Sequence, residues 1–303
     1  MENSFRSGFV GVVGIPNMGK SSLVNQLIGE KVGIVSEKPQ TTRKSVVGIY
    51  SNKEMQALFV DAPGFIKADK GLNKFLQDEA GSVTDKSDVL MLLLTTEGHN
   101  TKTAERALEE VSRKNKPWFV VINKMDTNKT HRVLILEELV KKYDVPIFRH
   151  STVESLYDQS NEILAHIKTL LPKSPGPLYD TESFTTSITR DWVSEVIREK
   201  CFELLHQELP FNMAVQVQKF EESTAKSCVK IYTDIIVTKK NHCSMVIGKK
   251  GQMIKEIGQK ARLEIEDLLG EKVYLELFTK VKPSWMEDKR MLKELGYVVE
   301  KDS

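Results

Sequence analysis

The feature that most constrains this chain is a glycine loop near its N-terminus, Gly14–Ser21, with the sequence Gly-Ile-Pro-Asn-Met-Gly-Lys-Ser. The loop follows the apolar run 9–13 and precedes residues 22–28, whose apolar positions have helical spacing. A strand, a glycine loop and a helix in this order are typical of a phosphate-binding loop, because glycine lets backbone N–H groups turn toward a di- or triphosphate. The sequence therefore predicts a nucleotide site here.

Side chains in this loop have distinct predicted roles. Lys20 is expected to reach the β and γ phosphates, and Ser21 offers a hydroxyl ligand to Mg²⁺. The N-terminus of the following helix adds partial positive charge. The predicted nucleotide contacts of the loop are Gly14, Ile15, Pro16, Asn17, Met18, Gly19, Lys20, Ser21 and Ser22.

Two later segments are predicted to contact the γ-phosphate and its metal ion. Residues 33–43 lack hydrophobic periodicity, and Thr42 within them can reach Mg²⁺ only while a γ-phosphate is present. Asp61, at the end of a strand-like run, can hold Mg²⁺ through water, and the Gly64 N–H can meet the γ-phosphate. The predicted metal ligands are Ser21, Thr42 and Asp61, the predicted catalytic residues are Asn17, Lys20, Thr42 and Gly64, and this side of the nucleotide site also includes Ala62, Pro63 and Phe65.

A second motif, Asn123-Lys124-Met125-Asp126, follows the apolar run 118–122 and predicts recognition of guanine. Its aspartate can accept hydrogen bonds from N1–H and N2–H₂ of guanine, a pair that adenine does not offer. After a short strand at 145–148, Ser151 and Thr152 are expected to place a backbone N–H against guanine O6. Alanine is usual where Thr152 stands, but a backbone contact does not depend on the side chain. The predicted guanine contacts are Asn123, Lys124, Met125, Asp126, Ser151 and Thr152.

Strand-like and helical segments alternate through the first half of the chain. An almost continuous apolar run at 88–94 indicates a strand covered on both faces, and helices are predicted at 101–114 and 163–171. Because the candidate chemistry lies at strand ends, we predict an α/β domain with a doubly wound, mostly parallel sheet. His150 has no acid or nucleophile in sequence reach and is interpreted as structural.

Three prolines within residues 172–177 mark the predicted domain boundary, because this stretch cannot continue a helix. We predict a nucleotide-binding domain at 1–172, a linker at 173–186 and a second domain at 187–303. The expected elements of the second half are a helix at 188–205, strands at 213–220 and 228–237, a short helix ending at Ile247, a helix at 252–269 and a strand at 273–278.

The loop Gly248-Lys249-Lys250-Gly251 carries the predicted function of the second half. Between two helices, two glycines let the backbone approach a nucleic-acid strand, and the lysines supply charge for phosphates. Residues 239–262 contain seven Lys or Arg and one acid, Glu256. This order of elements is that of a type II KH module, which binds single-stranded RNA. The predicted RNA contacts are Ile247, Gly248, Lys249, Lys250, Gly251, Lys255, Lys282 and Trp285, although Trp285 has a second interpretation, pinning the C-terminal tail.

Composition limits the class of protein and its compartment. The 303 residues, 40% hydrophobic and 28% charged, suggest about two soluble domains. Because the net charge is only +2, any attraction to nucleic acid must come from a local patch of positive charge. The three cysteines are far apart, which predicts free thiols in a reducing compartment. The N-terminus lacks a signal peptide's apolar core, and no run approaches the ~20 residues of a membrane span, so we expect a cytoplasmic protein or one peripheral to a membrane.

Taken together, the motifs resemble the Era family of ribosome-assembly GTPases, in which a Ras-like domain precedes a type II KH domain. The resemblance rests on the ordered motifs above, on Gln-Thr-Thr-Arg at 40–43 and on Ile-Gly-Lys-Lys-Gly-Gln-Met-Ile-Lys-Glu-Ile-Gly at 247–258. It implies GTP and GDP binding, contact with the 3′ end of 16S ribosomal RNA, a role in its maturation within the 30S subunit, and loose association with the inner membrane.

The resemblance also frames the expected mechanism, a slow GTP switch. Ras-like enzymes carry a water-orienting glutamine where this chain has Phe65, so help with hydrolysis must come from elsewhere. Asn17 occupies the position that coordinates K⁺ in related GTPases, although it could instead only brace the loop. Two alternatives stay open: a metabolic nucleotide kinase, and a GTPase whose second half docks on a membrane or a protein.

Overall fold

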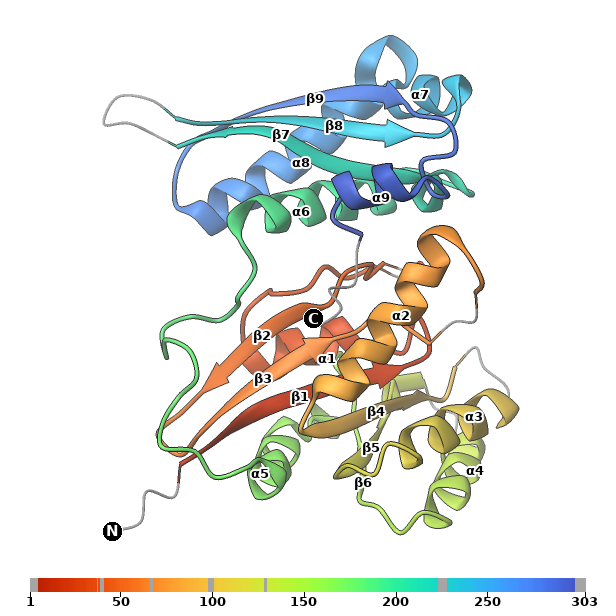
Figure 1. Ribbon diagram of the computed structural model, residues 1–303, viewed down its shortest axis with the longest axis vertical. Coiled ribbons are helices and arrows are strands. Elements are labelled where there is room, and N and C mark those ends of the chain that lie inside the picture. The colour runs from red at the N-terminus through yellow and green to blue at the C-terminus, as the bar shows by residue number, and fades with distance from the viewer. Residues whose placement is uncertain are drawn as a thin grey trace. The chain divides into compact units, whose positions relative to one another are not determined.

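The computed structural model describes residues 5–36, 38, 41–65, 68–97, 101–127, 130–222 and 228–297. Pro39 and Gln40 of the predicted switch segment lie outside the described residues. The described chain divides into two compact units (Figure 1). The first holds the residues up to Asp69 together with Asn73–Thr186, and the second holds Lys70–Leu72 and the residues from Ser187 onward.

The first unit is built on a six-stranded sheet with helices on both faces (Figure 1). The strand order is β2-β3-β1-β4-β5-β6, and all pairs are parallel except β2 with β3. This confirms the predicted doubly wound, mostly parallel sheet. Its strands are β1 (Arg6–Gly14), β2 (Val46–Ser51), β3 (Met55–Asp61), β4 (Val89–Thr95), β5 (Trp118–Asn123) and β6 (Ile147–Arg149). Its helices are α1 (Lys20–Ile28), α2 (Gly71–Lys86), α3 (Thr101–Ser112), α4 (Thr130–Lys141) and α5 (Ser160–Leu170).

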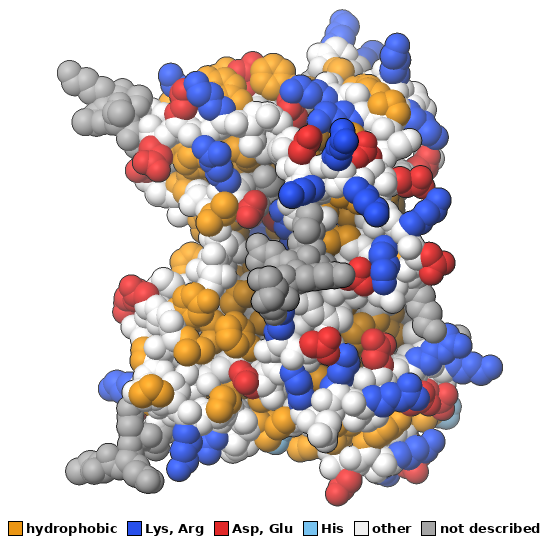
Figure 2. Space-filling model, in the orientation of Figure 1, with side chains coloured by type: hydrophobic (Ala, Val, Ile, Leu, Met, Phe, Trp, Pro, Cys, Tyr) orange, Lys and Arg blue, Asp and Glu red, His pale blue; other side chains and the backbone are white. Residues whose placement is uncertain are grey.

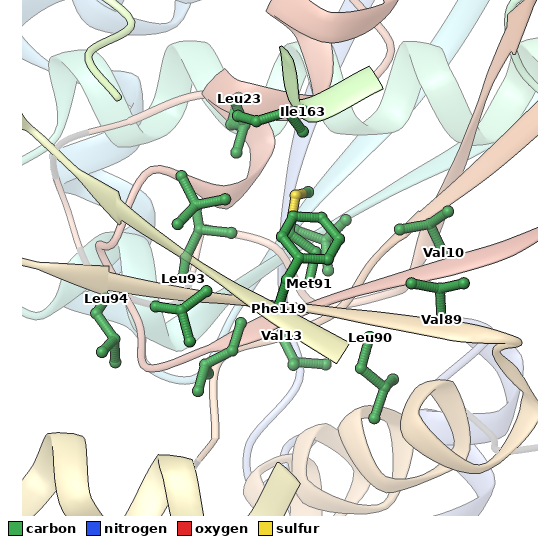
Figure 3. Packing of buried hydrophobic residues seen from close by; sticks show 14 of the residues in the cluster. Val10, Val13, Leu23, Val89, Leu90, Met91, Leu93, Leu94, Phe119 and Ile163 are labelled. Carbon is green, nitrogen blue, oxygen red and sulfur yellow. The ribbon is translucent and has the colours of Figure 1, made fainter. Parts of the chain in front are cut away.

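The core of this unit lies against β4, in which all seven residues are buried. Figure 3 shows Phe119 of β5 and Met91 of β4 among the buried side chains of this core, together with aliphatic side chains of β1 and β4. Burial on both faces of the sheet explains why the strand reads as a continuous apolar run. At roughly 25 cal/mol per Å² of apolar surface, this burial is the main force that holds the strand ends, and hence the candidate site, in place.

The segment predicted as a linker, residues 173–186, packs along the first unit. Gln56 of β3 is fully buried, and its Oε1 accepts hydrogen bonds from the N–H groups of Leu178 and Tyr179 (2.7 and 2.9 Å). Further along, the Ile49 N–H donates to the Phe184 carbonyl and the Thr186 N–H donates to the Val47 carbonyl. Residues 184–186 therefore extend the sheet as an antiparallel edge beside β2.

The second unit has the predicted order helix, strand, strand, helix, helix, strand. Its sheet has the order β7-β8-β9, with β7 antiparallel and β9 parallel to β8. The elements are α6 (Thr189–Leu204), β7 (Met213–Glu221), β8 (Val229–Val237), α7 (Lys240–Ile247), α8 (Gln252–Leu269), β9 (Val273–Val281) and a short helix that the sequence analysis does not predict, α9 (Lys289–Glu294). Cys201, Cys228 and Cys243 are free thiols, as predicted.

Candidate nucleotide site and nucleic-acid interface

The glycine loop turns between β1 and α1 as predicted, and its lysine folds back over it. Lys20 is buried, and its Nζ donates to the Ile15 carbonyl at 3.0 Å. Burial lowers the pKa of Lys20 to about 8, and the nearby Asp61 carboxylate acts in the opposite direction. The chain needs glycine at position 19, where φ is +84° and a Cβ would lie 2.4 Å from Asn123 Nδ2.

A cleft opens beside this loop, and the segment leading to Thr42 forms part of its wall. Because backbone N–H groups and the buried Lys20 side chain lie here, the cleft suits an anionic ligand such as a polyphosphate. The residues that line it are Pro16, Asn17, Gly19, Lys20, Ser21, Ser22, Ile34, Val35, Ser36, Thr41, Thr42 and Gly64.

The structure brings together all three predicted metal ligands. Ser21 Oγ donates to Asp61 Oδ2 at 2.5 Å, Ser21 Oγ and Thr42 Oγ1 are 3.1 Å apart, and Thr42 Oγ1 lies 3.5 Å from Asp61 Oδ2. Asp61 is 1% exposed, and its Oδ1 is a buried oxygen with no hydrogen-bond partner among the described residues. Burial raises the pKa of Asp61, while Lys20 and the two hydroxyls favour its ionised form. Hard oxygen ligands of this kind fit Mg²⁺.

The Asp61–Gly64 turn lies directly against the glycine loop. A Cβ at position 64 would lie 2.3 Å from the Pro16 nitrogen, so only glycine allows this approach. The Phe65 N–H donates to the Gly14 carbonyl at 2.9 Å, and the Phe65 side chain packs against the hydrophobic core. A hydrocarbon ring packed in this way cannot orient a water molecule.

The guanine motif is tied to the glycine loop and to the Ser151 segment. Asn123 Nδ2 donates to the Met18 carbonyl at 2.9 Å, which links β5 to the phosphate side of the site. Ser151 Oγ donates to Asp126 Oδ1 at 2.6 Å and accepts hydrogen bonds from the N–H groups of Val153 and Glu154. The Asp126 carboxylate is therefore held in place by the Ser151 side chain.

Sequence reasoning missed Asn25, which fixes the start of the segment that leads to Thr42. Its Oδ1 accepts from the N–H groups of Val32 and Gly33 (3.0 and 2.9 Å), and its Nδ2 donates to the Gly33 carbonyl (2.8 Å). The only available signal was a polar residue within the apolar helical pattern of α1, followed by the irregular stretch that the side chain holds. That signal does not identify Val32 and Gly33 as the hydrogen-bond partners.

In the second unit, the loop between α7 and α8 has the backbone that close approach requires. Gly248 and Gly251 have φ of +72° and +77°, and Lys250 between them has φ of +52°. A Cβ at position 248 would lie 2.6 Å from that of Met253, so glycine is required there. Lys249, Lys250 and Lys255 are exposed, Ile247 is 39% exposed, and Figure 2 shows Lys and Arg side chains around the α7 end of this unit.

Two of the predicted RNA contacts lie apart from this loop in the sequence, and one is wrong. Trp285 is fully buried: its ring stacks on Tyr297 and its Nε1–H donates to the Asn212 carbonyl. A side chain held in this way cannot stack on a base, so Trp285 pins the C-terminal segment to its own unit. Lys282 is half-buried, with its Nζ 3.9 Å from Glu294.

The described residues contain no further metal cluster and no helix suited to crossing a membrane. Within them, no cluster of three or more His, Cys, Asp and Glu side chains is arranged to hold a metal ion. No helix in this part of the chain combines the length and the apolar character needed to cross a bilayer.

Comparison with known proteins finds one matching family within each of the two units. Residues 9–124 match the family described as 50S ribosome-binding GTPase, and residues 208–286 match the KH domain family. The GTPase Era of Geobacter metallireducens is 38% identical over 299 residues, covering 98% of this chain and 99% of the relative. That of Geotalea uraniireducens is 39% identical over 298 residues, with the same coverage.

Two solved structures of similar proteins cover 97% of this chain and 100% of their own chains, each at 33% identity and a TM-score of 0.91. One is a variant of Aquifex aeolicus Era bound to GDP·AlF4⁻. The other is Era in complex with MgGDPNP and nucleotides 1506–1542 of 16S ribosomal RNA.

Proposed function

This chain belongs to the Era family of GTPases, and from that premise we propose that it is a slow GTP switch acting on small-subunit ribosomal RNA. The partner is the 3′ end of 16S ribosomal RNA, and the role is maturation of that RNA during assembly of the 30S subunit. The similar Era solved with MgGDPNP and a 16S fragment supports this choice of ligands. The observation that carries the switch is the convergence of Thr42 on Ser21 and Asp61.

The geometry above supports the proposed nucleotide contacts. Lys20 and the loop N–H groups bind the β and γ phosphates, Gly64 meets the γ-phosphate, and Asp126 with the Ser151 segment reads guanine. When bound at Ser21, Thr42 and Asp61, Mg²⁺ supplies positive charge against the charge that develops during phosphoryl transfer. Because Thr42 belongs to this set only while a γ-phosphate is present, hydrolysis releases its segment.

Asn17 is the proposed route by which the chain compensates for Phe65. It is exposed at the mouth of the cleft with φ of +66°, where its side chain can hold a K⁺ ion against the phosphates. We expect GTP turnover to fall about tenfold or more when Na⁺ replaces K⁺ at constant ionic strength, and Asn17→Ala to remove this dependence. Equal single-turnover rates in both salts would mean that Asn17 only braces the loop.

The domain assignment and the location complete the proposal. The GTPase domain spans 1–172, residues 173–186 connect it to the RNA-binding domain, and that domain spans 187–303. The protein works in the cytoplasm and associates loosely with the inner face of the membrane, as its family resemblance implies. Flotation with anionic vesicles, in the presence and absence of 16S fragments, tests the membrane part separately.

RNA binding by the α7–α8 loop is tested by charge reversal. Lys249→Glu with Lys250→Glu should weaken binding of a 16S 3′-end oligonucleotide at least about a hundredfold and reduce the salt dependence of binding, because two phosphate contacts are lost. The matched control is Lys289→Glu with Lys293→Glu, which makes the same charge change in α9. Fluorescence anisotropy with a GTP analogue and with GDP measures both the affinity and its dependence on nucleotide. Equal affinities for the loop variant and the control would overturn the proposed interface.

A further inference from the structure

His150 lies between the two segments proposed to read guanine. Its side chain is fully buried and it stands one residue before Ser151. The His150 N–H donates to the Ile122 carbonyl at 2.8 Å, and the His150 carbonyl accepts from the Met125 N–H at 3.1 Å. The backbone of this residue therefore joins the Asn123–Asp126 motif to the Ser151 segment.

The imidazole ring makes a second connection, toward the phosphate side of the site. Nδ1 accepts from the Gln159 N–H at 3.2 Å, and Nε2 lies 3.3 Å from Oε1 of Gln26 in α1. Because Nδ1 faces an N–H group, it must carry the lone pair, so the neutral ring has its proton on Nε2 and donates it to Gln26. Since α1 begins at Lys20, the ring links the phosphate-binding helix to the start of α5.

We propose that His150 is a positioning residue for guanine recognition: its neutral ring holds the Ser151 segment at a fixed distance from α1. Base and phosphates are parts of one ligand, so the two halves of the site must keep their spacing for both to be bound at once. This inference rests on the guanine contacts proposed above, and it adds a residue that touches neither base nor phosphate.

Protonation of the ring would undo this arrangement. A proton on Nδ1 would face the Gln159 N–H, leaving two donors opposed in a buried position. Among the described neighbours of the ring, Gln26 and Gln159 are uncharged, and the facing carboxylate is Asp158, with Oδ1 4.0 Å from Nδ1. Burial lowers the pKa of His150, and Asp158 opposes this shift. The positioning is therefore complete at neutral pH and is lost as the pH falls through the lowered pKa.

The test is GDP affinity of the full chain with Mg²⁺, measured by titration calorimetry from about pH 8 to about pH 5.5. The wild-type affinity should fall at the acidic end, where binding of GDP should release one proton from the ring. His150→Leu removes both ring bonds and should bind GDP about tenfold more weakly at neutral pH, with no such acidic fall. His150→Asn keeps an acceptor for the Gln159 N–H and should restore most of the affinity while remaining insensitive to acid.

A second readout separates positioning from a merely structural role. Inosine diphosphate lacks the N2 amino group that Asp126 would bind, so the ratio of GDP to IDP affinity reports how well the base is placed. His150→Leu should reduce this ratio. A lower melting temperature with an unchanged ratio and an unchanged acid profile would overturn the proposal.

The chain supplies matched controls. His166 in α5 also has a pKa lowered by burial, but its ring packs against Phe119 and Phe148, away from the guanine segments. His166→Phe should leave the ratio and the acid profile as in the wild type. Asp126→Asn tests the guanine site itself: if it weakens GDP binding while His150→Leu does not, only the role of His150 fails, whereas unchanged binding by Asp126→Asn removes the guanine contacts too.

Discussion

Asn25 is a single side chain that fixes the start of the segment leading to Thr42. It makes three hydrogen bonds to Val32 and Gly33, immediately before the stretch that leads to Thr42. The backbone up to Gly33 is not free to follow Thr42, since Ile34 is the first residue beyond these bonds. The proposed release of Thr42 would therefore begin beyond Gly33 and would not extend into α1.

Removing the hydrogen bonds of Asn25 to Val32 and Gly33 should affect the triphosphate-bound protein most. Asn25→Ala should lower the free energy of unfolding by about 2 kcal/mol, because three partly buried hydrogen bonds are lost. It should also weaken binding of a GTP analogue with Mg²⁺ more than binding of GDP, since Thr42 contributes only with a γ-phosphate. Urea unfolding and nucleotide titrations measure the two effects.

Asn52 provides the comparison for this prediction. Its Oδ1 accepts from the N–H groups of Glu54 and Met55 in the β2–β3 turn, both at 2.8 Å, so it makes the same kind of bond away from the cleft. Asn52→Ala should leave the ratio of GTP-analogue to GDP affinity unchanged. If Asn25→Ala also leaves that ratio unchanged, the Asn25 hydrogen bonds do not support binding of the triphosphate through Thr42.

At the scale of elements, helices and loops could be predicted where the indicating residues are neighbours in the sequence. Helix α8 begins and ends where expected, because Gly251 precedes it and Gly270 follows it, both in left-handed conformations. The loops at strand ends were predicted because their motifs are contiguous. Helices α2 and α4 were not predicted, nor was the short α9. Helix α2 contains Gly81, and α4 exposes Leu134 and Ile135 among its buried residues, which blurs the helical period.

Contacts between distant segments carry no local signal, and the residues 173–186 illustrate this. Prolines correctly indicate the end of α5, but nothing in the sequence pairs Gln56 with Tyr179, which lies 123 positions later. The side chain of Gln56 satisfies both N–H groups of Leu178 and Tyr179 and donates in return to the Tyr179 carbonyl. The proline-rich composition of this segment predicts a linker, whereas in the structure the segment is hydrogen-bonded to the sheet.

The anchor at Gln56 can be tested without any ligand. Gln56→Leu places an apolar side chain of similar size in this buried position and removes these bonds, so amide exchange at Leu178 and Tyr179 should accelerate at least about tenfold. Exchange at Thr186, whose N–H bonds to Val47, should change little because that anchor is separate. Hydrogen exchange with mass spectrometry resolves the two sites, and equal protection in wild type and variant would contradict the assigned role of Gln56.

At the scale of the whole molecule, the sequence predicted the two kinds of chemistry and their order along the chain. The sequence does not show whether Trp285 stacks on a base or packs within its own unit, because an aromatic residue after a strand is compatible with both roles. The structure places that ring against Tyr297, a contact that only the folded unit reveals.

The edge formed by residues 184–186 has a mechanical consequence. Only Ser187 and Ile188 separate Thr186, whose N–H is bonded to β2, from Thr189, where α6 begins. Three virtual bonds of about 3.8 Å each join those two anchored residues, so they can never be more than about 11 Å apart. Residues 187–188 are therefore too few to act as a long flexible linker between the last bonded residue of the edge and the first residue of α6.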